Sequence, residues 1–254
     1  ADVLGHERVV TLELAARADR AGAQAVVLSE HHGSDDGYLP SPLILASAVA
    51  ARTERVPIVV SALLGLFYDT VHLAEDLAVL DIISGGRVAC TLGIGYRPEE
   101  LTMFGVDAAA RGDRMEELIA FLRAAWTGEP VEHPERGPVT VTPVPCTPGG
   151  PILMYGGHSK PAARRAARNQ MLFQAVSDDP ALVEAYEAEA ARVGVEPVGC
   201  MLVAPGTPTS LFVADDVDAA WAEIGGYLLN DATRYSEWNE QRDGITSIER
   251  ARTV

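Results

Sequence analysis

The sequence predicts an α/β fold with a parallel sheet, and three observations lead to that prediction. Short apolar runs that suit strands buried on both faces alternate with segments of helical periodicity along most of the 254 residues. Helix-stop glycines, such as Gly22 and the pair Gly85 and Gly86, separate these segments. No stretch has the composition of a flexible linker, so we expect a single domain over residues 1–254. The alternation alone does not decide between an open, doubly wound sheet and a closed barrel.

The first half of the chain opens with a helix and continues in strand and helix pairs. Apolar residues recur at helical spacing over Glu7–Ala21, and the valine-rich run Ala23–Ser29 suits a buried strand. Ser41 and Pro42 fit the cap and the first position of the next helix. The elements that follow are the helix Leu43–Arg52, the strand Val56–Leu63, the helix Val71–Ile83, the strand Arg87–Ile94 and the helix Arg111–Trp126.

The second half begins with an interruption. Residues 128–150 are rich in proline and glycine, with a short possible strand at Val139–Val141, and we interpret them as an insertion. The alternation resumes with the strand Pro151–Tyr155, the helix Ser159–Arg168, the strand Met171–Ala175, the helix Ala181–Val193, the strand Ser210–Ala214 and the helix Asp216–Leu229, capped by Asp215. These six strands are fewer than the eight of a closed barrel, so a barrel would either be incomplete in its first and last units or be atypical.

The composition excludes several classes of function. The formal charge of −16 and the pI near 4.7 oppose a polyanionic partner, so no nucleic acid is expected. No window is apolar enough for a membrane helix, and residues 1–11 carry charges where a secretion signal is apolar. We therefore expect a soluble, cytoplasmic protein with no membrane partner. The three cysteines are widely spaced without a CxxC pair, which favours neither disulfides nor a zinc site.

The loop after the first strand carries the most reactive side chains. Functional residues of parallel α/β folds collect where strands end, and here Glu30, His31 and His32 follow one another. Histidine titrates near neutral pH, so an acid–base role is one interpretation and a structural role is the other. The remaining histidines form no HxH or HExxH pattern with these two, so no metal site is expected.

Two glycine-rich loops are candidates for binding a cofactor. The loop after the third strand contains Gly93, Gly95, Tyr96 and Arg97, but it lacks the GxGxxG pattern of a nicotinamide site. The loop after the fourth strand contains Gly156, Gly157, His158 and Ser159, and it precedes a helix. Backbone N–H groups at a helix N-terminus suit a phosphate, although a simple tight turn is the alternative. That helix carries a basic cluster, interpreted as a phosphate site or a solvated face: Lys160, Arg164, Arg165 and Arg168.

Together these stretches resemble the luciferase-like flavin monooxygenase family over residues 15–221. The sequences that carry the resemblance are LSEHH at 28–32, ARTERV at 51–56, LAEDLAVLDIISGGRV at 73–88, LGIGYRPEELTMFGV at 92–106, RGDRMEELIAFLRAAWTGEPV at 111–131 and ILMYGGHSKPAARRAAR at 152–168. The resemblance implies a (β/α)8 TIM-type barrel with an insertion. It also implies reduced FMN or the deazaflavin coenzyme F420 as cofactor.

By position, the resemblance makes His31 the catalytic candidate, because the first histidine of EHH assists the oxygen chemistry in one subgroup. It places a bulge at Ser61 and Ala62, beneath the flavin ring, where family members often have a cis peptide bond. It places the phosphate at the loop from Gly156 to Ser159. The sequence departs from the family at Ile94, where bacterial luciferase has a phosphate-binding arginine, so the phosphate would depend on that loop or on Arg97. The turn at residues 169–172 departs as well.

The expected function is oxidation of a small organic substrate by reduced FMN and dioxygen. A separate flavin reductase would supply the FMN, and the helix over residues 73–83 offers apolar surface for a homodimer. Two alternatives stay open, which are hydride transfer with F420 and a non-catalytic barrel subunit. The family's first strand would precede Glu7, and its last strand and helix would follow Val254.

Overall fold

The computed structural model describes residues 2–204 and 210–239, and its centre is a parallel sheet. The strands pair in the order β1 Val26–Leu28, β2 Ile58–Leu63, β3 Val88–Leu92, β6 Ile152–Gly157, β7 Leu172–Ala175 and β8 Cys200–Met201. Every pairing is parallel, and the spatial order follows the chain order. A doubly wound sheet reverses its strand order at a switch point, and this sheet does not. The fold is therefore of the TIM-barrel type.

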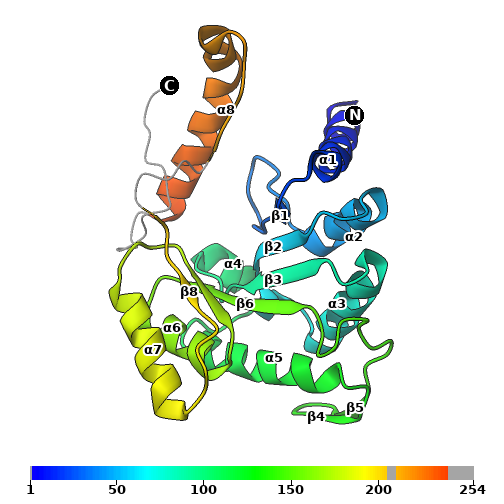
Figure 1. Cartoon of the computed structure of the whole chain (residues 1–254), viewed down its shortest axis with the longest axis vertical. Helices are drawn as coiled ribbons and strands as arrows, with labels where there is room; N and C mark the ends of the chain where they lie inside the picture. Colours follow the sequence, from blue (N-terminus) through cyan, green and yellow to red (C-terminus); the bar gives the residue numbers. More distant parts are fainter. Residues whose placement is uncertain (1, 205–209, 240–254) are drawn as a thin grey trace.

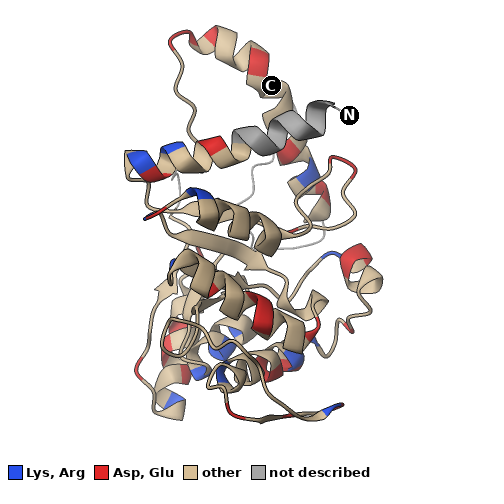
Figure 2. Cartoon of the chain, turned by 90° about the vertical axis from the view of Figure 1, so that its right-hand side faces the viewer, with Lys and Arg blue, Asp and Glu red and all other residues tan. Residues whose placement is uncertain are grey.

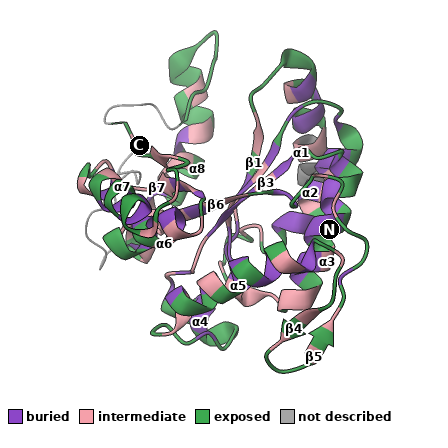
Figure 3. Ribbon diagram, turned by 60° about the horizontal axis from the view of Figure 1, so that its bottom comes forward, coloured by how far each residue is buried: buried purple, intermediate pink, exposed green. Residues whose placement is uncertain are grey.

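Helices flank the strands on their outer side (Figures 1 and 3). They are α1 Asp2–Ala21, α2 Pro42–Arg52, α3 Thr70–Ser84, α5 Arg111–Ala125, α6 Lys160–Arg168 and α7 Ala181–Val193. Shorter turns, η1 Gly65–Phe67 and α4 Pro98–Met103, follow β2 and β3. The long helix α8, Val217–Trp238, stands apart from this layer in Figure 1. Within the described residues no helix combines the length and the apolar character that crossing a membrane requires.

The core lies between the sheet and these helices. Leu73 and Leu77 of α3 are fully buried, as are Met115 and Ile119 of α5, because a spacing of four residues places each pair on one helix face. Part of the apolar stripe over residues 73–83, which the sequence offered as a dimer surface, therefore lies in the interior. The exposed apolar residues of α3 are Val79, Ile82 and Ile83. In the expected insertion, β4 Val131–His133 and β5 Gly137–Val139 form an antiparallel hairpin apart from the main sheet.

One expected strand is wrong. Residues 210–214 form no strand, and the last strand of the sheet is β8 instead. The run is apolar, which suggested a buried strand, yet Leu211 is 83% and Val213 92% exposed. The helix that follows begins one residue later than expected, because the side chain of Asp216, not of Asp215, accepts the N–H of Ala219 at 3.0 Å. It also continues beyond the expected end at Leu229 to Trp238.

Candidate active site

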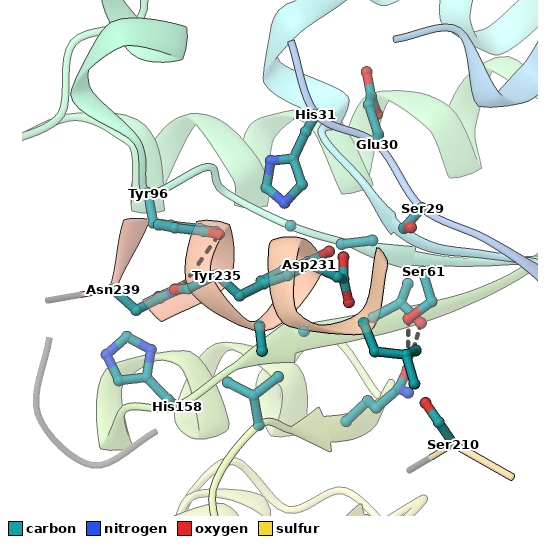
Figure 4. A pocket seen from close by; sticks show the side chains of 18 of the residues that line it. Ser29, Glu30, His31, Ser61, Tyr96, His158, Ser210, Asp231, Tyr235 and Asn239 are labelled. Atoms are coloured by element: carbon teal, nitrogen blue, oxygen red, sulfur yellow. Dashed lines mark hydrogen bonds between the residues drawn. The ribbon is translucent and has the colours of Figure 1, made fainter. Parts of the chain in front are cut away.

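A cavity of about 1100 Å³ lies at the carboxyl ends of the strands, with α8 forming part of its wall (Figure 4). This is the edge at which the fold collects functional residues. The predicted site residues that line it are Glu30, His31, Ser61, Ala62, Gly93, Gly95, Tyr96, Gly156, Gly157, His158 and Ser159. His32 and Arg97 lie outside this lining. The topology thus gathers the ends of β1, β2, β3 and β6 around one space.

Glu30 joins the ends of the first two strands. Its Oε2 accepts the backbone N–H of Leu64 at 2.7 Å, and its Oε1 accepts the hydroxyl of Tyr68 at 3.0 Å. Nε2 of His32 lies 2.9 Å from the same Oε1. Burial, together with the charge of Glu30, raises the pKa of Tyr68, so the phenol keeps the proton that it donates. Glu30 is 2% exposed and both of its carboxylate oxygens accept hydrogen bonds, which is the pattern of a positioning residue.

His31 is held from behind by a buried carboxylate. Its Nδ1 lies 2.9 Å from Oε1 of Glu100, which also accepts the N–H of His32 at 2.9 Å and Nη1 of Arg97 at 3.0 Å. Burial alone would raise the pKa of Glu100, but these hydrogen bonds and the charges of His31 and Arg97 lower it. Because the carboxylate is ionised, Nδ1 carries the proton and donates it. Nε2 is left for the cavity, toward which the ring points in Figure 4.

Aromatic rings enclose the imidazole of His31. The ring centres of Tyr38 and Trp238 lie 4.9 and 4.7 Å from it, and those of Tyr96 and Tyr235 lie at 5.7 and 5.8 Å. Such a box shields the His31–Glu100 pair from water, which strengthens the electrostatic interaction within it.

Arg97 completes this enclosure. Its guanidinium lies 4.3 Å from the ring centre of Trp238 and donates to the carbonyl oxygen of His32 at 2.9 Å, in addition to its bond with Glu100. The arginine is 7% exposed. Its guanidinium is therefore occupied by Glu100, His32 and Trp238 and does not line the cavity.

The floor of the cavity is polar and crosses three strands. The peptide bond between Ser61 and Ala62 is cis and the pairing of β2 with β3 shifts register there, which confirms both features implied by the resemblance. The hydroxyl groups of Ser61 and Thr91 donate to Oε1 of Gln174 at 3.3 and 2.6 Å. A Cβ on Gly93 would lie 2.9 Å from the Cβ of Ala62, so only glycine fits beside this bond. The result is a hydrogen-bonded polar surface formed by side chains of β2, β3 and β7.

The opposite end of the cavity is the N-terminus of α6. Ser159 caps this helix, and its Oγ accepts the N–H of Ala162 at 3.4 Å. Pro161 has no N–H, so the first turn presents the backbone N–H of Lys160 and the hydroxyl of Ser159 as donors. A Cβ on Gly157 would lie 2.8 Å from the Cβ of Ala162, which keeps strand and helix in close contact. These donors and the helix dipole suit an anion.

Most of the predicted basic cluster is occupied elsewhere. Arg168 pairs with Glu116 of α5 at 2.9 Å and with Glu189 of α7 at 2.8 Å. Arg165 pairs with Asp113 and Glu116 of α5 at 3.3 Å each. Acidic and basic residues accordingly lie together in the lower part of Figure 2. The arginines fasten α6 to its neighbours, and they do not form a phosphate site.

One cation in the cavity was not predicted. Arg111, the first residue of α5, lines the cavity and donates Nη1 to the carbonyl oxygen of Gly95 at 3.1 Å. Among the described lining residues it is the only lysine or arginine. Its guanidinium therefore places a positive charge beside the Gly95 loop.

The profile of the family described as luciferase-like monooxygenase matches residues 9–253 of the chain. The chain belongs to the luciferase-like monooxygenase family. The monooxygenase RslO1 from Streptomyces bottropensis has a similar structure, with a TM-score of 0.76 and 26% identity, and the match covers 95% of this chain and 74% of that one.

Two curated relatives show the range of cofactors around this luciferase-like chain. The oxygenase component of a flavin-dependent trigonelline monooxygenase from Acinetobacter baylyi is 32% identical over 124 residues, which are 48% of this chain and 34% of that protein. An F420-dependent glucose-6-phosphate dehydrogenase from Microbacterium testaceum is 32% identical over 164 residues, which are 61% of this chain and 48% of that protein. Each match spans less than half of the relative. The comparisons thus place the luciferase-like chain among oxidoreductases that use a flavin or F420.

Several polar residues in and behind this luciferase-like cavity carry no clear signal in the sequence. Glu100 stands within the quoted stretch LGIGYRPEELTMFGV, but only the fold brings it behind His31. Gln174 and Thr91 are polar residues within apolar strands, which is a signal that a pocket-facing position leaves in the sequence.

Proposed function

We propose that this protein is a flavin-dependent monooxygenase that oxidises a small organic substrate with reduced FMN and dioxygen. The observation that carries the proposal is the pairing of His31 with buried Glu100 at a cavity whose far end is the N-terminus of α6. A polar floor, with a close approach of Gly93 to Ala62, lines the same cavity. Such a reaction requires three features, which are a histidine for proton transfer, a surface that holds the flavin ring and a site for its phosphate.

The donor set fits FMN. The loop from Gly156 to Ser159 and the N–H of Lys160 would hold the phosphate, with Arg111 as the cation nearby. The surface formed by Ser61, Thr91 and Gln174 would hold the flavin ring by hydrogen bonds. Drug-sized ligands occupy clefts of about 300–1,000 Å³, and this cavity of about 1100 Å³ leaves room for a substrate as well.

When bound, reduced FMN supplies the electrons and the reaction with dioxygen. His31 would exchange a proton at Nε2 with the reacting groups, while ionised Glu100 keeps the ring in the tautomer that has its proton on Nδ1. Tyr38, Tyr96 and Trp238 would exclude water around this step. Glu30 and His32 would act by positioning, because their hydrogen bonds hold the loop that carries His31.

Two partners belong to the proposal. A separate flavin reductase would supply reduced FMN, which agrees with a relative named as an oxygenase component. A second copy of this chain would pack on the exposed apolar residues of α2 and α3, among them Ile44, which is 75% exposed, and Ile82. Light scattering at micromolar concentration is expected to give the mass of a dimer, and a monomer would end this part of the proposal.

Hydride transfer with F420 is the second candidate, and the similarity to an F420-dependent dehydrogenase favours it. Ultraviolet–visible spectra of the purified protein, recorded during titration with each cofactor, distinguish the two. Perturbation of the FMN spectrum, followed by oxygen uptake when the flavin is reduced, supports the monooxygenase. A response to F420 alone supports hydride transfer. No response to either cofactor supports the non-catalytic subunit.

A further inference from the structure

The cavity has two unlike walls. The strand side carries the hydrogen-bonding groups that the proposed flavin would use, such as Ser61, Thr91 and Gln174. The other side is formed by α8, which contributes Trp221, Ile224 and Leu228 at helical spacing. A cofactor seated on the polar floor would leave the α8 side for the substrate.

The apolar residues of this wall line the cavity without being packed away. Ile224 and Leu228 are half-buried, and Trp221 is 52% exposed. Each buried methylene of a ligand that covers them would contribute about 0.8 kcal/mol, a factor of about four in affinity. Binding energy on this side of the cavity therefore grows with the apolar area of the ligand.

The charge of the α8 wall disfavours an anion. Asp231 lines the cavity, and Figure 4 shows it on α8 among Tyr235, His31 and Ser61. Among the described lining residues the only lysine or arginine is Arg111, which is bonded to Gly95 on the strand side. A carboxylate, sulfonate or phosphate on the substrate would thus meet repulsion without a compensating cation.

The wall is no better suited to a cation. A single exposed carboxylate among apolar side chains offers one partner to an ammonium group, which would lose most of its hydration against Trp221 and Leu228.

We infer that the substrate is an uncharged, predominantly apolar molecule that binds between α8 and the ends of the strands. The inference rests on the proposed function for the placement of the cofactor. It goes beyond that function by naming the substrate class, which the apolar wall and the position of Asp231 determine.

The test uses the full chain loaded with oxidised FMN and three probes of equal chain length, namely 1-octanol, octanoate and octyltrimethylammonium. Binding is measured by isothermal titration calorimetry. Octanol is expected to bind at least about tenfold more tightly than either ion, given the cost of desolvating a charge beside an apolar wall. Equal or tighter binding of octanoate or of the ammonium probe would overturn the inference.

Two variants locate the binding. Leu228→Ser is expected to weaken octanol binding about fivefold, with Ile224→Ser as a second variant for the same wall. Tyr227→Ser is the matched control, because Tyr227 lies on the same helix, is 79% exposed and does not line the cavity. Octanol affinity that is unchanged in both cavity variants, or equally reduced in the control, would contradict the placement.

Asp231→Asn examines the charge directly. It is expected to strengthen octanoate binding several-fold and to leave octanol unchanged. If the parent binds the ammonium probe tightly and Asp231→Asn binds it much more weakly, the substrate is instead a cation. The FMN titration is run first, so that absence of FMN binding tests the proposed function and the probe ranking on the loaded protein tests the substrate class.

Discussion

The two ends of the cavity, at His31 and at the N-terminus of α6, are built from different chemical groups. Behind His31, buried ionised groups and hydrogen-bonding side chains fill the structure, with Glu100 accepting three hydrogen bonds on one oxygen. At the N-terminus of α6, glycines, a serine cap and backbone N–H groups form the surface. A proton-transfer group must be fixed in orientation and tautomer, which takes side chains. A phosphate needs only correctly directed donors, which a helix terminus provides.

The largest effect is expected at the His31 end of the cavity. His31→Ala should slow substrate oxidation about a hundredfold or more, the usual scale for a positioned acid or base, while FMN affinity stays within a few-fold. Stopped-flow oxidation and a flavin titration measure the two quantities. His133→Ala, in the hairpin outside the cavity, serves as the control and should leave both unchanged. Full turnover in His31→Ala would return this histidine to a structural role.

Glu100→Gln is expected to lower turnover by a smaller factor. The amide no longer enforces a proton on Nδ1 of His31, so turnover should fall about tenfold or more, but less than in His31→Ala. The pH profile of turnover should shift, because an ionised neighbour of the imidazole has been removed. A fall in thermal stability without any change in turnover or in pH profile would mean that Glu100 only supports the fold.

At the N-terminus of α6, Ser159→Asp should lower the affinity for FMN and for F420 about fivefold or more. A carboxylate there repels a phosphate and occupies its hydrogen-bond donors, whose interaction with an anion is worth about 1 kcal/mol. Helix stability should hold, since aspartate is a good cap. Ser41→Asp is the matched control, because Ser41 also precedes a helix with proline in its first turn but does not line this cavity. Equal cofactor affinity in both variants and the parent would place the phosphate elsewhere.

The smallest effect concerns the ion pairs that hold α6 in place. Hydrogen bonds from Arg192 and Arg168 lower the pKa of Glu189 to about 2, below its ordinary value of 4.5. The carboxylate therefore contributes stability that is present above pH 5 and is lost as the pH falls toward 2. Glu189→Gln should lower the melting temperature by about a few degrees at neutral pH, with the difference shrinking on acidification.

Glu187→Gln is the control for this measurement, because Glu187 lies exposed on the same helix. It should show no comparable change with pH. A difference between the parent and Glu189→Gln that grows as the pH falls would contradict the assigned ion pairs.

The two ends also differ in how far the sequence predicts them. The loop from Gly156 to Ser159 is continuous in sequence, so its position before a helix and its donors follow from local rules. The His31 end depends on Glu100 and on Tyr235 and Trp238 of α8, which only the tertiary fold brings together. Local patterns carry no information about such contacts.

The same distinction explains the errors in the fold. The central strands and helices were predicted within a few residues, because their apolar periodicity is strong. The run 210–214 has the same local character, but it lies exposed at the cavity, so burial and not composition decided its structure. The charge of Arg97 makes it a phosphate candidate in the sequence, whereas the fold directs it toward Glu100 and Trp238.

The division between the two ends is tested most directly by combining His31→Ala with Ser159→Asp. For the parent, both single variants and the double variant, the FMN dissociation constant is measured, together with the oxidation rate at saturating FMN. If the two ends act separately, the double variant loses rate as His31→Ala does and affinity as Ser159→Asp does, each within a factor of about two. A reduced rate at saturating FMN in Ser159→Asp, or weakened FMN binding in His31→Ala that matches Ser159→Asp, would contradict the separation of chemistry from anchoring.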